Sequence, residues 1–437
     1  MVRECESAHC SGADAEINEI CKQEGWAIGH PVLTRDSQGP CTCRCSCFAL
    51  NTPIFISEDE IKAIQDIKEG DYVYAAGLDL KWYQKKVVFS QGTIGKSRQP
   101  LTVYIDYGDN QHFIVTPDSL FLMENKKLKR ADKLTPEDYL IDQNGNKVKI
   151  NGVDIGDFYG GFHHIATATE KPSSNLEGHL ILANGIVCGD YNLQIYYQSQ
   201  EALNTENFVE TNDLTVGTKE YKNKYGTVDK INEDLFIPSH KNQIIEPPSH
   251  ASTFLADDDA RRYKKTGSFR GFTDPNSRAW AEYLIKQYEA YYPDINFLLD
   301  WDSEVVNAFA WMDSGKRYVQ LKGGLVRSKE LEIEGIALVL AHEIGHHYGG
   351  DPVSSNGLSC EGQADFYGAR DVMRRVWFGE FYINIMEKAI EQLSEFFKVA
   401  YAPGEEAGFS CEHPPGPCRI ETYNAAVDLK PKPDCAK

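Results

Sequence analysis

The spacing of apolar residues divides the chain into a β-rich part and a helical part. From residue 47 to about residue 198, short apolar runs such as Leu101–Ile105 and His179–Ala183 alternate with turns such as Asn184–Gly185. Short apolar runs bounded by Gly and Asn are typical of β-strands. This pattern predicts an all-β domain over residues 47–198.

A helical period replaces this pattern after Ser268. Aromatic and aliphatic residues then recur every three or four positions, which is the spacing of one helix face. They are Trp280, Tyr283, Leu284, Tyr288 and Tyr291. Pro293 ends this helix, and a strand-like run, Ile295–Leu299, and a hairpin turning at Asp313–Lys316 follow it. We therefore expect an α+β domain, mainly helical, over residues 266–437.

The most apolar helical stretch, Ile336–Ala341, leads directly into a polar cluster. His342 and His346 stand four residues apart, so they lie on one helix face, close enough to share a metal ion. Glu343 follows the first histidine and would lie beside such an ion, where it can take a proton from water. The pair Gly349–Gly350 is expected to end the helix.

Chance also puts two histidines at this spacing on some buried helices. Burying two histidines and a carboxylate is costly, however, unless a partner such as a metal compensates. Ser328 can cap the start of this helix, and the acidic residues after it suit the positive end of the helix dipole. We therefore predict a buried helix that binds Zn²⁺ through His342 and His346.

The composition limits the classes of function. With 437 residues, the chain is long enough for two or three domains. Its net charge of −20 argues against binding to nucleic acid or to anionic membranes. No apolar run approaches the roughly 18 to 20 residues of a membrane helix, and the first residues do not have the pattern of a signal peptide. We expect a soluble protein without nucleic-acid partners.

The 12 cysteines are unevenly distributed. Seven fall within the first 47 residues, Cys188 stands alone, and the others are Cys360, Cys411, Cys418 and Cys435. The even late set predicts two disulfides, with Cys360 paired to Cys411 or Cys418. Disulfides favour an oxidising compartment, secreted or periplasmic, and a cytoplasmic location is the alternative.

Two further segments lack a clear apolar period. Residues 1–46 end in alternating cysteines, Cys41 to Cys47, which need partners elsewhere because neighbours on one face of a strand are too far apart to bridge. Disulfides to the earlier cysteines are the favoured reading, and a soft metal site is the alternative. Residues 199–265 are polar and interrupted by Pro and Asn, which predicts a linker with some local structure.

Three blocks of the β-rich part resemble Hedgehog/intein (Hint) domains. Cys47–Ile54 is similar to the opening block of that family, Val115–Phe121 to its second block, and Leu182–Val187 to its closing block. The blocks occur in the family's order and span the whole β-rich part. The resemblance implies a horseshoe-shaped all-β fold whose two ends meet.

By this resemblance, Cys47 would attack the carbonyl of Ser46 and convert that peptide bond into a thioester. The second block keeps its threonine, Thr116, but Ser119 stands where the family has a histidine. The closing block has Cys188–Gly189 in place of His-Asn, which argues against full splicing. Because the two ends of such a fold meet, we also expect a disulfide between Cys47 and Cys188, which would keep the Cys47 nucleophile inactive. Self-cleavage before Cys47 and an inert scaffold both stay open.

A second set of blocks carries another resemblance. The blocks are Asn307-Ala308-Phe309, Gly324-Leu325, His342 to His346, Glu361-Gly362-Gln363-Ala364-Asp365, and His413-Pro414-Pro415 with Arg419-Ile420. Their order is similar to that in the gluzincin family of CAAX prenyl endopeptidases and HtpX peptidases. The membrane helices of those enzymes are missing here, so the resemblance implies a soluble, zincin-like catalytic core over about Ser268 to Ile420.

The resemblance makes Glu361 the third zinc ligand. Asp365, four residues later on the same helix face, would accept the free ring N–H of a ligating histidine. His413, Arg419 and Asn307 are candidates to bind substrate or the oxyanion.

The sequence contains one other candidate for the third ligand. The histidine motif also begins the metzincin pattern, whose third ligand would fall at Pro352, which has no donor atom, with Asp351 one residue short. Glu361 is therefore the preferred ligand.

These expectations describe a multidomain protein. It has a cysteine-rich segment (1–46), an all-β Hint domain (47–198), a polar linker (199–265) and a zincin-like metallopeptidase domain (266–437). The expected function is zinc-dependent endoproteolysis of a protein or peptide substrate, with self-cleavage before Cys47 as a second activity. The alternatives are a self-processing module with peptidase-like cargo and a secreted binding protein with a degenerate zinc site.

Overall fold

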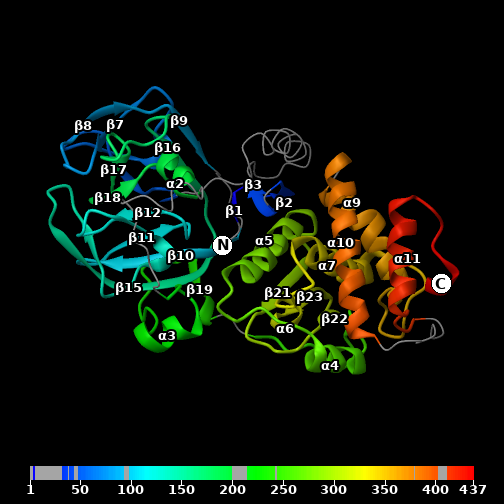
Figure 1. The fold of residues 1–437 in the computed structure, drawn as a ribbon. Coiled ribbons are helices and arrows are strands. Elements are labelled where there is room, and N and C mark those ends of the chain that lie inside the picture. The colour runs from blue at the N-terminus through cyan, green and yellow to red at the C-terminus, as the bar shows by residue number, and fades with distance from the viewer. Residues whose placement is uncertain are drawn as a thin grey trace. The chain divides into compact units, whose positions relative to one another are not determined.

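The computed structural model describes residues 3–4, 32–37, 39–43, 48–92, 98–198, 214–241, 244–377, 379–401 and 411–437 (Figure 1). These residues form two compact units. We call one the β unit; it holds the described residues within Arg44–Asn242. The other, the helical unit, holds those within Met1–Cys10, Pro31–Cys43 and Gln243–Lys437.

Within the residues that the structure describes, the β unit contains two sheets of eight strands each. In the first, the order is β14 (Tyr139–Ile141), β15 (Lys147–Phe158), β10 (Gln99–Tyr107), β11 (Gln111–Val115), β4 (Phe48–Ala49), β16 (Phe162–Ala166) and β9 (Phe89–Gly92), and β19 (Phe236–Pro238) also pairs with β15. In the second, it is β13 (Leu128–Arg130), β12 (Leu120–Leu122), β18 (Ile186–Gly189), β17 (Leu180–Ala183), β5 (Pro53–Phe55) and β6 (Ile61–Ala63), and β7 (Tyr72–Ala76) pairs with β17 and with β8 (Tyr83–Lys86). The prediction of an all-β fold is confirmed.

The hairpin of β10 and β11 lies at the centre of the first sheet. Ile105 is opposite Phe113 in the ladder, and the turn places Gly108 and Asn110 at positive φ, 53° and 59°. Gly and Asn tolerate this conformation, which explains why the turn falls here. Phe113 packs edge-on against Phe121 of the second sheet, with ring centroids 5.4 Å apart, so the two sheets share one core.

The structure divides residues 199–265 differently from the expected linker. In the β unit, α2 (Tyr191–Gln198) precedes the segment, and α3 (Lys219–Tyr225) lies within it. Tyr221 of α3 is buried, and its hydroxyl donates to the carbonyl oxygen of Leu134 at 2.8 Å. Tyr221 thus anchors α3 on the β core, whereas the described residues from Ile244 onward belong to the helical unit.

The helical unit is built on one mixed sheet in the order β20 (Ser252–Thr253), β22 (Ala308–Asp313), β23 (Lys316–Lys322) and β21 (Ile295–Asp300). β22 and β23 form the predicted hairpin. Its turn residues, Ser314 and Gly315, both have positive φ, 49° and 79°, as a tight two-residue hairpin turn requires. β21 runs parallel to β23, and β20 lies at the opposite edge of the sheet.

Helices make up most of the rest of this unit. They are α4 (Asp257–Thr266), α5 (Pro275–Tyr291), α6 (Gly323–Val326), α7 (Ile333–Tyr348), α8 (Glu361–Tyr367), α9 (Met373–Val376), α10 (Gly379–Ala400) and α11 (Gly416–Val427), with a π-helical turn, η4 (Gly368–Val372), between α8 and α9. Short 3₁₀ turns lie in the β unit at η1 (Ile64–Asp66), η2 (Ala131–Lys133) and η3 (Ser239–Lys241), and in the helical unit at η5 (Asp434–Ala436). The mainly helical α+β class predicted for the C-terminal part is confirmed.

The helix predicted from the aromatic spacing is α5. Asp274 caps it by accepting from the backbone N–H of Ser277 at 3.0 Å, and Pro275 occupies the first turn, where its missing N–H costs nothing. The predicted face is buried, with Trp280, Tyr288 and the residues between them in the core. The helix ends before Pro293, as expected.

The histidine helix is α7, and almost all of it is buried. Its first residue is Ile333, and the cap position, Glu332, makes no side-chain capping bond. The prediction that Ser328 caps this helix is wrong, because the Ser328 hydroxyl donates to the carbonyl oxygen of Gly324 instead. Gly349 ends the helix and Gly350 follows it with φ 73°, as expected.

A strand pair from the start of the chain belongs to the helical unit. β2 (Val32–Asp36) pairs antiparallel with β3 (Gly39–Cys43), and β1 (Arg3–Glu4) pairs with β3. Leu33 is fully buried; its N–H donates to Gln287 Oε1 at 3.2 Å, and its carbonyl accepts from Trp377 Nε1 at 3.1 Å. Arg35 donates to Glu334 in the first turn of α7. This part of the cysteine-rich segment is therefore not separate from the helical unit.

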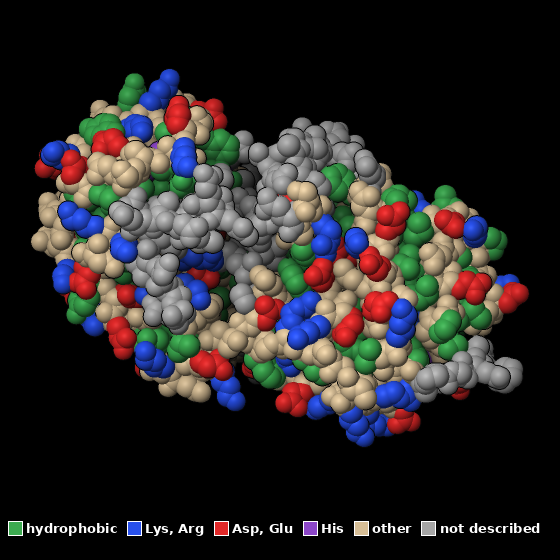
Figure 2. Space-filling model, in the orientation of Figure 1, with side chains coloured by type: hydrophobic (Ala, Val, Ile, Leu, Met, Phe, Trp, Pro, Cys, Tyr) green, Lys and Arg blue, Asp and Glu red, His purple; other side chains and the backbone are tan. Residues whose placement is uncertain are grey.

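Among the described residues, no helix is both long and apolar enough to cross a membrane. On the face drawn in Figure 2, acidic and basic side chains are interspersed with polar and apolar ones.

Candidate metal centre

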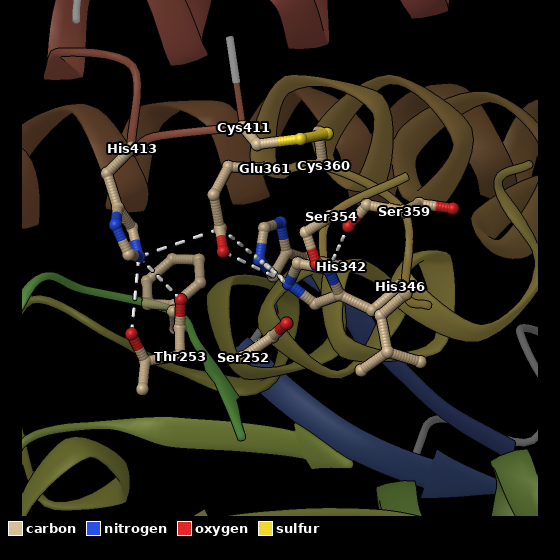
Figure 3. Close-up of polar contacts among 12 residues, drawn as sticks. Ser252, Thr253, His342, His346, Ser354, Ser359, Cys360, Glu361, Cys411 and His413 are labelled. Atoms are coloured by element: carbon tan, nitrogen blue, oxygen red, sulfur yellow. Dashed lines mark hydrogen bonds and ion pairs between the residues drawn. A yellow bond between two sulfur atoms is a disulfide. The ribbon is translucent and has the colours of Figure 1, made fainter. Parts of the chain in front are cut away.

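Three side chains from α7 and α8 converge at the candidate metal centre (Figure 3). His342 Nε2 lies 3.1 Å from His346 Nε2 and 3.2 Å from Glu361 Oε2. His346 Nε2 lies 3.5 Å from Glu361 Oε1. All three residues are buried, and one ligand atom of each lies within 4.8 Å of the others. Of the described residues, these three form a group that could hold a metal ion.

The far ring nitrogen of each histidine has its own partner. His342 Nδ1 lies 2.8 Å from Asp365 Oδ1, and His346 Nδ1 lies 2.7 Å from the carbonyl oxygen of Ser359. Both partners are acceptors, so each Nδ1 carries the proton and each Nε2 presents a lone pair to the centre. With Nδ1 donating, the Nε2 atoms of both histidines face the Glu361 carboxylate, and a bound cation would replace any proton that they share with it.

Close helix packing places Glu361 opposite the histidines. A Cβ at Gly345 of α7 would lie 2.5 Å from the carbonyl oxygen of Ala364, so only glycine lets α8 approach this near. The disulfide between Cys360 and Cys411 joins the residue before Glu361 to the start of the C-terminal segment. The structure also pairs Cys418 with Cys435, so the prediction of two late disulfides is confirmed.

Glu343 has the environment of a proton acceptor. It is fully buried, and neither of its carboxylate oxygens has a hydrogen-bond partner among the described residues. Burial raises its pKa to about 7, although His342 and His346 oppose this rise. A carboxyl group with a pKa near 7 can both take up and release a proton at neutral pH. Burial also raises the pKa of Glu361, but His413 and His346 outweigh this effect and hold that pKa well below its usual range.

Asp365 joins His342 to a buried polar cluster. Its oxygens accept from Arg419 Nε at 2.9 Å and Arg419 Nη2 at 2.8 Å, and from the Tyr423 hydroxyl at 2.7 Å. Arg419 and His342 hold the pKa of Asp365 well below its usual range, against the effect of burial. Asp365 therefore stays ionised beside the imidazole that it orients. Tyr423 was not singled out from the sequence, because nothing in its local pattern distinguishes it from a core tyrosine.

The three candidates for binding substrate or the oxyanion have different surroundings. His413 Nε2 lies 3.6 Å from Glu361 Oε2 and donates to the carbonyl oxygen of Thr253 at 2.6 Å. Arg419 is fully buried, and its donors are directed to Asp365 and to the backbone oxygen of Phe254. Asn307 is also buried and bonds the backbone of Leu255, as donor and as acceptor. Arg419 Nη2 also lies 3.3 Å from His342 Nδ1, so the structure brings His413 and Arg419, but not Asn307, next to the ligand cluster.

Two neighbours of the histidine motif point elsewhere. His347 Nε2 lies 3.0 Å from the carbonyl oxygen of Tyr318, and the Tyr348 hydroxyl donates to Asp294 at 2.5 Å. Asp351, the alternative third ligand, is exposed and does not belong to the group that could hold a metal.

The expected reactive residues of the β unit are only partly described. Cys47 lies outside the described residues. Thr116 Oγ1 lies 3.3 Å from Ser119 Oγ, and Ser119 is fully buried. Cys188 is a free, buried thiol whose pKa burial raises well above its usual value, so the expected disulfide between Cys47 and Cys188 is absent.

A buried histidine–carboxylate contact in the β unit was not anticipated. His179 Nδ1 lies 3.2 Å from Asp190 Oδ1, although the sequence suggested only a strand and its turn here. Asp190 also accepts from the backbone N–H groups of Thr167 and Leu193, so it closes a local network.

Comparisons with known proteins give two kinds of match. No curated protein matches the chain. Among solved structures, the chain is similar to the bacterial intein-like domain from Clostridium thermocellum, with 20% identity over 33% of this chain and 97% of that one and a TM-score of 0.28. It is similar to the gp41-1 intein, with 18% identity over 33% of this chain and 98% of that one and a TM-score of 0.26. It is also similar to a DnaB intein from Synechocystis sp. PCC 6803, with 15% identity over 33% of this chain and 98% of that one and a TM-score of 0.25.

The family comparison concerns the helical unit. Residues 275–381 match the model of peptidase family M48. The matched segment runs from α5 into α10 and includes His342, His346 and Glu361. The helical unit therefore carries a metallopeptidase domain of family M48.

Proposed function

We propose that the helical unit is a zinc-dependent endopeptidase of the gluzincin type that cleaves protein or peptide substrates. His342, His346 and Glu361 would hold the zinc ion. The observation that carries this proposal is the convergence of three buried ligand atoms beside a buried carboxylate, Glu343, that has no partner of its own among the described residues. Such a set of buried groups is costly without a cation.

The side chains divide the work of peptide hydrolysis. Zinc, when bound, supplies a Lewis acid that polarises the scissile carbonyl and makes water a better nucleophile. Glu343 takes the proton of the attacking water and passes it to the departing amine nitrogen. We assign to His413 Nε2, which lies near Glu361, donation to the carbonyl oxygen as negative charge develops on it, once its bond to the Thr253 carbonyl is released.

Three variants test this assignment. Glu361→Ala should lose most of the zinc and nearly all hydrolysis of a casein-type substrate. Glu343→Gln should keep zinc and lose hydrolysis, because it removes the base and leaves the ligands. Asp351→Asn is the control, since that carboxylate is exposed, and should change neither quantity by much. A zinc-free Asp351→Asn beside a zinc-replete Glu361→Ala would overturn the gluzincin assignment.

The same measurements separate the alternative of a binding protein with a degenerate zinc site. That alternative expects zinc in the wild type without any zinc-dependent hydrolysis of unfolded protein.

Self-cleavage before Cys47 is a second candidate function. It is supported by the pairing of β4 with β11, in which Phe48 is opposite Val115, the neighbour of Thr116. Hydroxylamine should split the wild-type chain before residue 47 and leave Cys47→Ala intact. The absence of cleavage in both proteins over a day would leave only a scaffold role for the β unit.

A further inference from the structure

One segment of the helical unit, Ile244–Leu255, runs along the sheet and past the candidate metal centre; we call it the strap. Its residues Ser252 and Thr253 form β20 and pair antiparallel with Ala310 and Phe309 of β22. β22 has β23 on its other side, so the strap occupies the edge of β22 that would otherwise be open.

An extended peptide can add to a sheet edge of this kind through main-chain hydrogen bonds. The strap also meets the residues around the metal centre. The carbonyl oxygen of Thr253 accepts from His413 Nε2 at 2.6 Å (Figure 3). The ring of Phe254 lies edge-on to the ring of His342, with centroids 5.3 Å apart.

Residues that the sequence marked as substrate contacts bind the strap instead. Asn307 holds both the N–H and the carbonyl oxygen of Leu255, at 2.9 Å each. Arg419 Nη1 donates to the carbonyl oxygen of Phe254 at 2.6 Å. These side chains and His413 form hydrogen bonds to the backbone of residues 253–255, the same kind of bond that would hold an extended peptide.

Side chains hold the upstream half of the strap to the rest of the unit. Lys322 Nζ lies 3.1 Å from Glu246 Oε2 in an ion pair. Gln320 Nε2 donates to the carbonyl oxygen of Ile245 at 2.9 Å. Asn356 Nδ2 donates to the carbonyl oxygen of His250 at 3.0 Å and to the Ser252 hydroxyl at 3.2 Å.

Burial increases along the strap. Ile244 is 61% exposed, Ser252 is half-buried, and Phe254 and Leu255 are fully buried. Because the upstream residues bury little apolar surface, opening them costs less than opening the two buried residues. The strap can therefore leave β22 from its upstream end while Phe254 and Leu255 stay anchored.

We propose that the strap holds the peptidase latent by occupying the substrate edge of β22, and that an extended peptide binds there only after Ser252 and Thr253 have left it. This proposal rests on the proposed peptidase function. It assigns the chain's own residues 252–253 as the competitor of substrate.

The variant Ser252→Gly/Thr253→Gly tests the proposal, because glycine disfavours the extended strand and removes the side-chain bonds to Asn356 and His413. Its kcat/KM on an internally quenched peptide should rise roughly ten-fold over wild type, at equal zinc content. The control is Asn296→Gly on β21, at the opposite edge of the same sheet, which should leave kcat/KM unchanged.

Hydrogen exchange measures the strap itself without relying on turnover. Amides of residues 249–253 should exchange faster in the double-glycine variant, and faster in wild type when a zinc-chelating peptide hydroxamate is bound. If wild type hydrolyses peptide and the loosened variant is no faster, the strap proposal is wrong and the peptidase function stands. If both proteins hold zinc, the strap exchanges faster in the variant and neither protein cleaves peptide, then both proposals fail. Continued protection of residues 249–253 with the hydroxamate bound also overturns latency.

Discussion

Arg419 and Asp365 form a two-bond ion pair that is fully buried directly behind His342, with N–O distances of 2.9 and 2.8 Å. Asp365 in turn orients the His342 ring through Nδ1. A partner of this kind sets the tautomer and the basicity of a metal-binding histidine. The pair would therefore act on the candidate metal centre through His342, without contacting a bound ion.

The first prediction follows from this relationship. Asp365→Ala should weaken zinc binding by about 10- to 100-fold while the three ligands remain present. The measurement is competition for zinc with a chromogenic chelator. Asp371→Ala is the matched control, because Asp371 pairs with Arg370 on the surface at 2.8 Å. Equal zinc affinities for Asp365→Ala and Asp371→Ala would contradict an orienting role for Asp365.

The second prediction concerns stability. Arg419→Ala leaves the Asp365 carboxylate buried without its cation, which should cost about 3–5 kcal/mol of unfolding free energy. Arg370→Ala removes the cation of a surface pair whose side chains are about 40% exposed and should cost at most about 1 kcal/mol. Urea titration followed by tryptophan fluorescence compares the two variants. A small effect of Arg419→Ala would mean that water reaches Asp365.

The third prediction concerns the disulfide between Cys418 and Cys435. It closes a loop of 17 residues that joins α11 to the end of the chain. By the loop-closure estimate, replacing both cysteines with serine should cost the helical unit about 3 kcal/mol. The loss of stability is measured by comparing the midpoints of thermal unfolding of this double variant and the wild type in the same buffer. An unchanged midpoint would show that the end of the chain contributes nothing to this unit.

The fourth prediction concerns the docked strand pair. If a site-specific protease sequence replaces Arg44–Ser46 in a Cys47→Ala background, the fragment before the cut should still co-elute with the rest of the protein after cleavage. Leu33 holds it there, because its side chain is fully buried and both of its backbone groups are bonded.

A second substitution makes this retention measurable. Leu33→Ala should weaken it by about 2–5 kcal/mol and so release the fragment at low concentration. A disulfide cannot account for retention in this background, since Cys188 is free and the four later cysteines pair with one another. Release of the unsubstituted fragment would contradict the docking.

Local patterns explain what the sequence predicted well. The α5 face and the α7 motif depend on spacings of three and four residues, and the turn at Ser314–Gly315 depends on residues that accept positive φ. The convergence of Glu361 with the two histidines required the family resemblance, because α8 is separate from α7 in the sequence and meets it only through packing at Gly345.

Long-range pairing explains what the sequence left hidden. Ser252–Thr253 and Val32–Asp36 are short extended segments, and such segments give no local signal of the strand or helix that they meet. Arg419 was expected to contact substrate, but it forms a buried ion pair with Asp365. A charged residue in a short sequence motif is compatible with either role, so the sequence alone could not distinguish them.

The bond between Leu33 and Trp377 joins residues 344 positions apart, and this separation determines the order in which the helical unit can be completed during synthesis. At 5–20 residues per second, a ribosome adds Trp377 roughly 17–70 s after Leu33. The β unit lies between them in the chain and is finished within that interval. Leu33 thus lacks its Trp377 partner until the β unit has been made, and the helical unit is completed after the β unit.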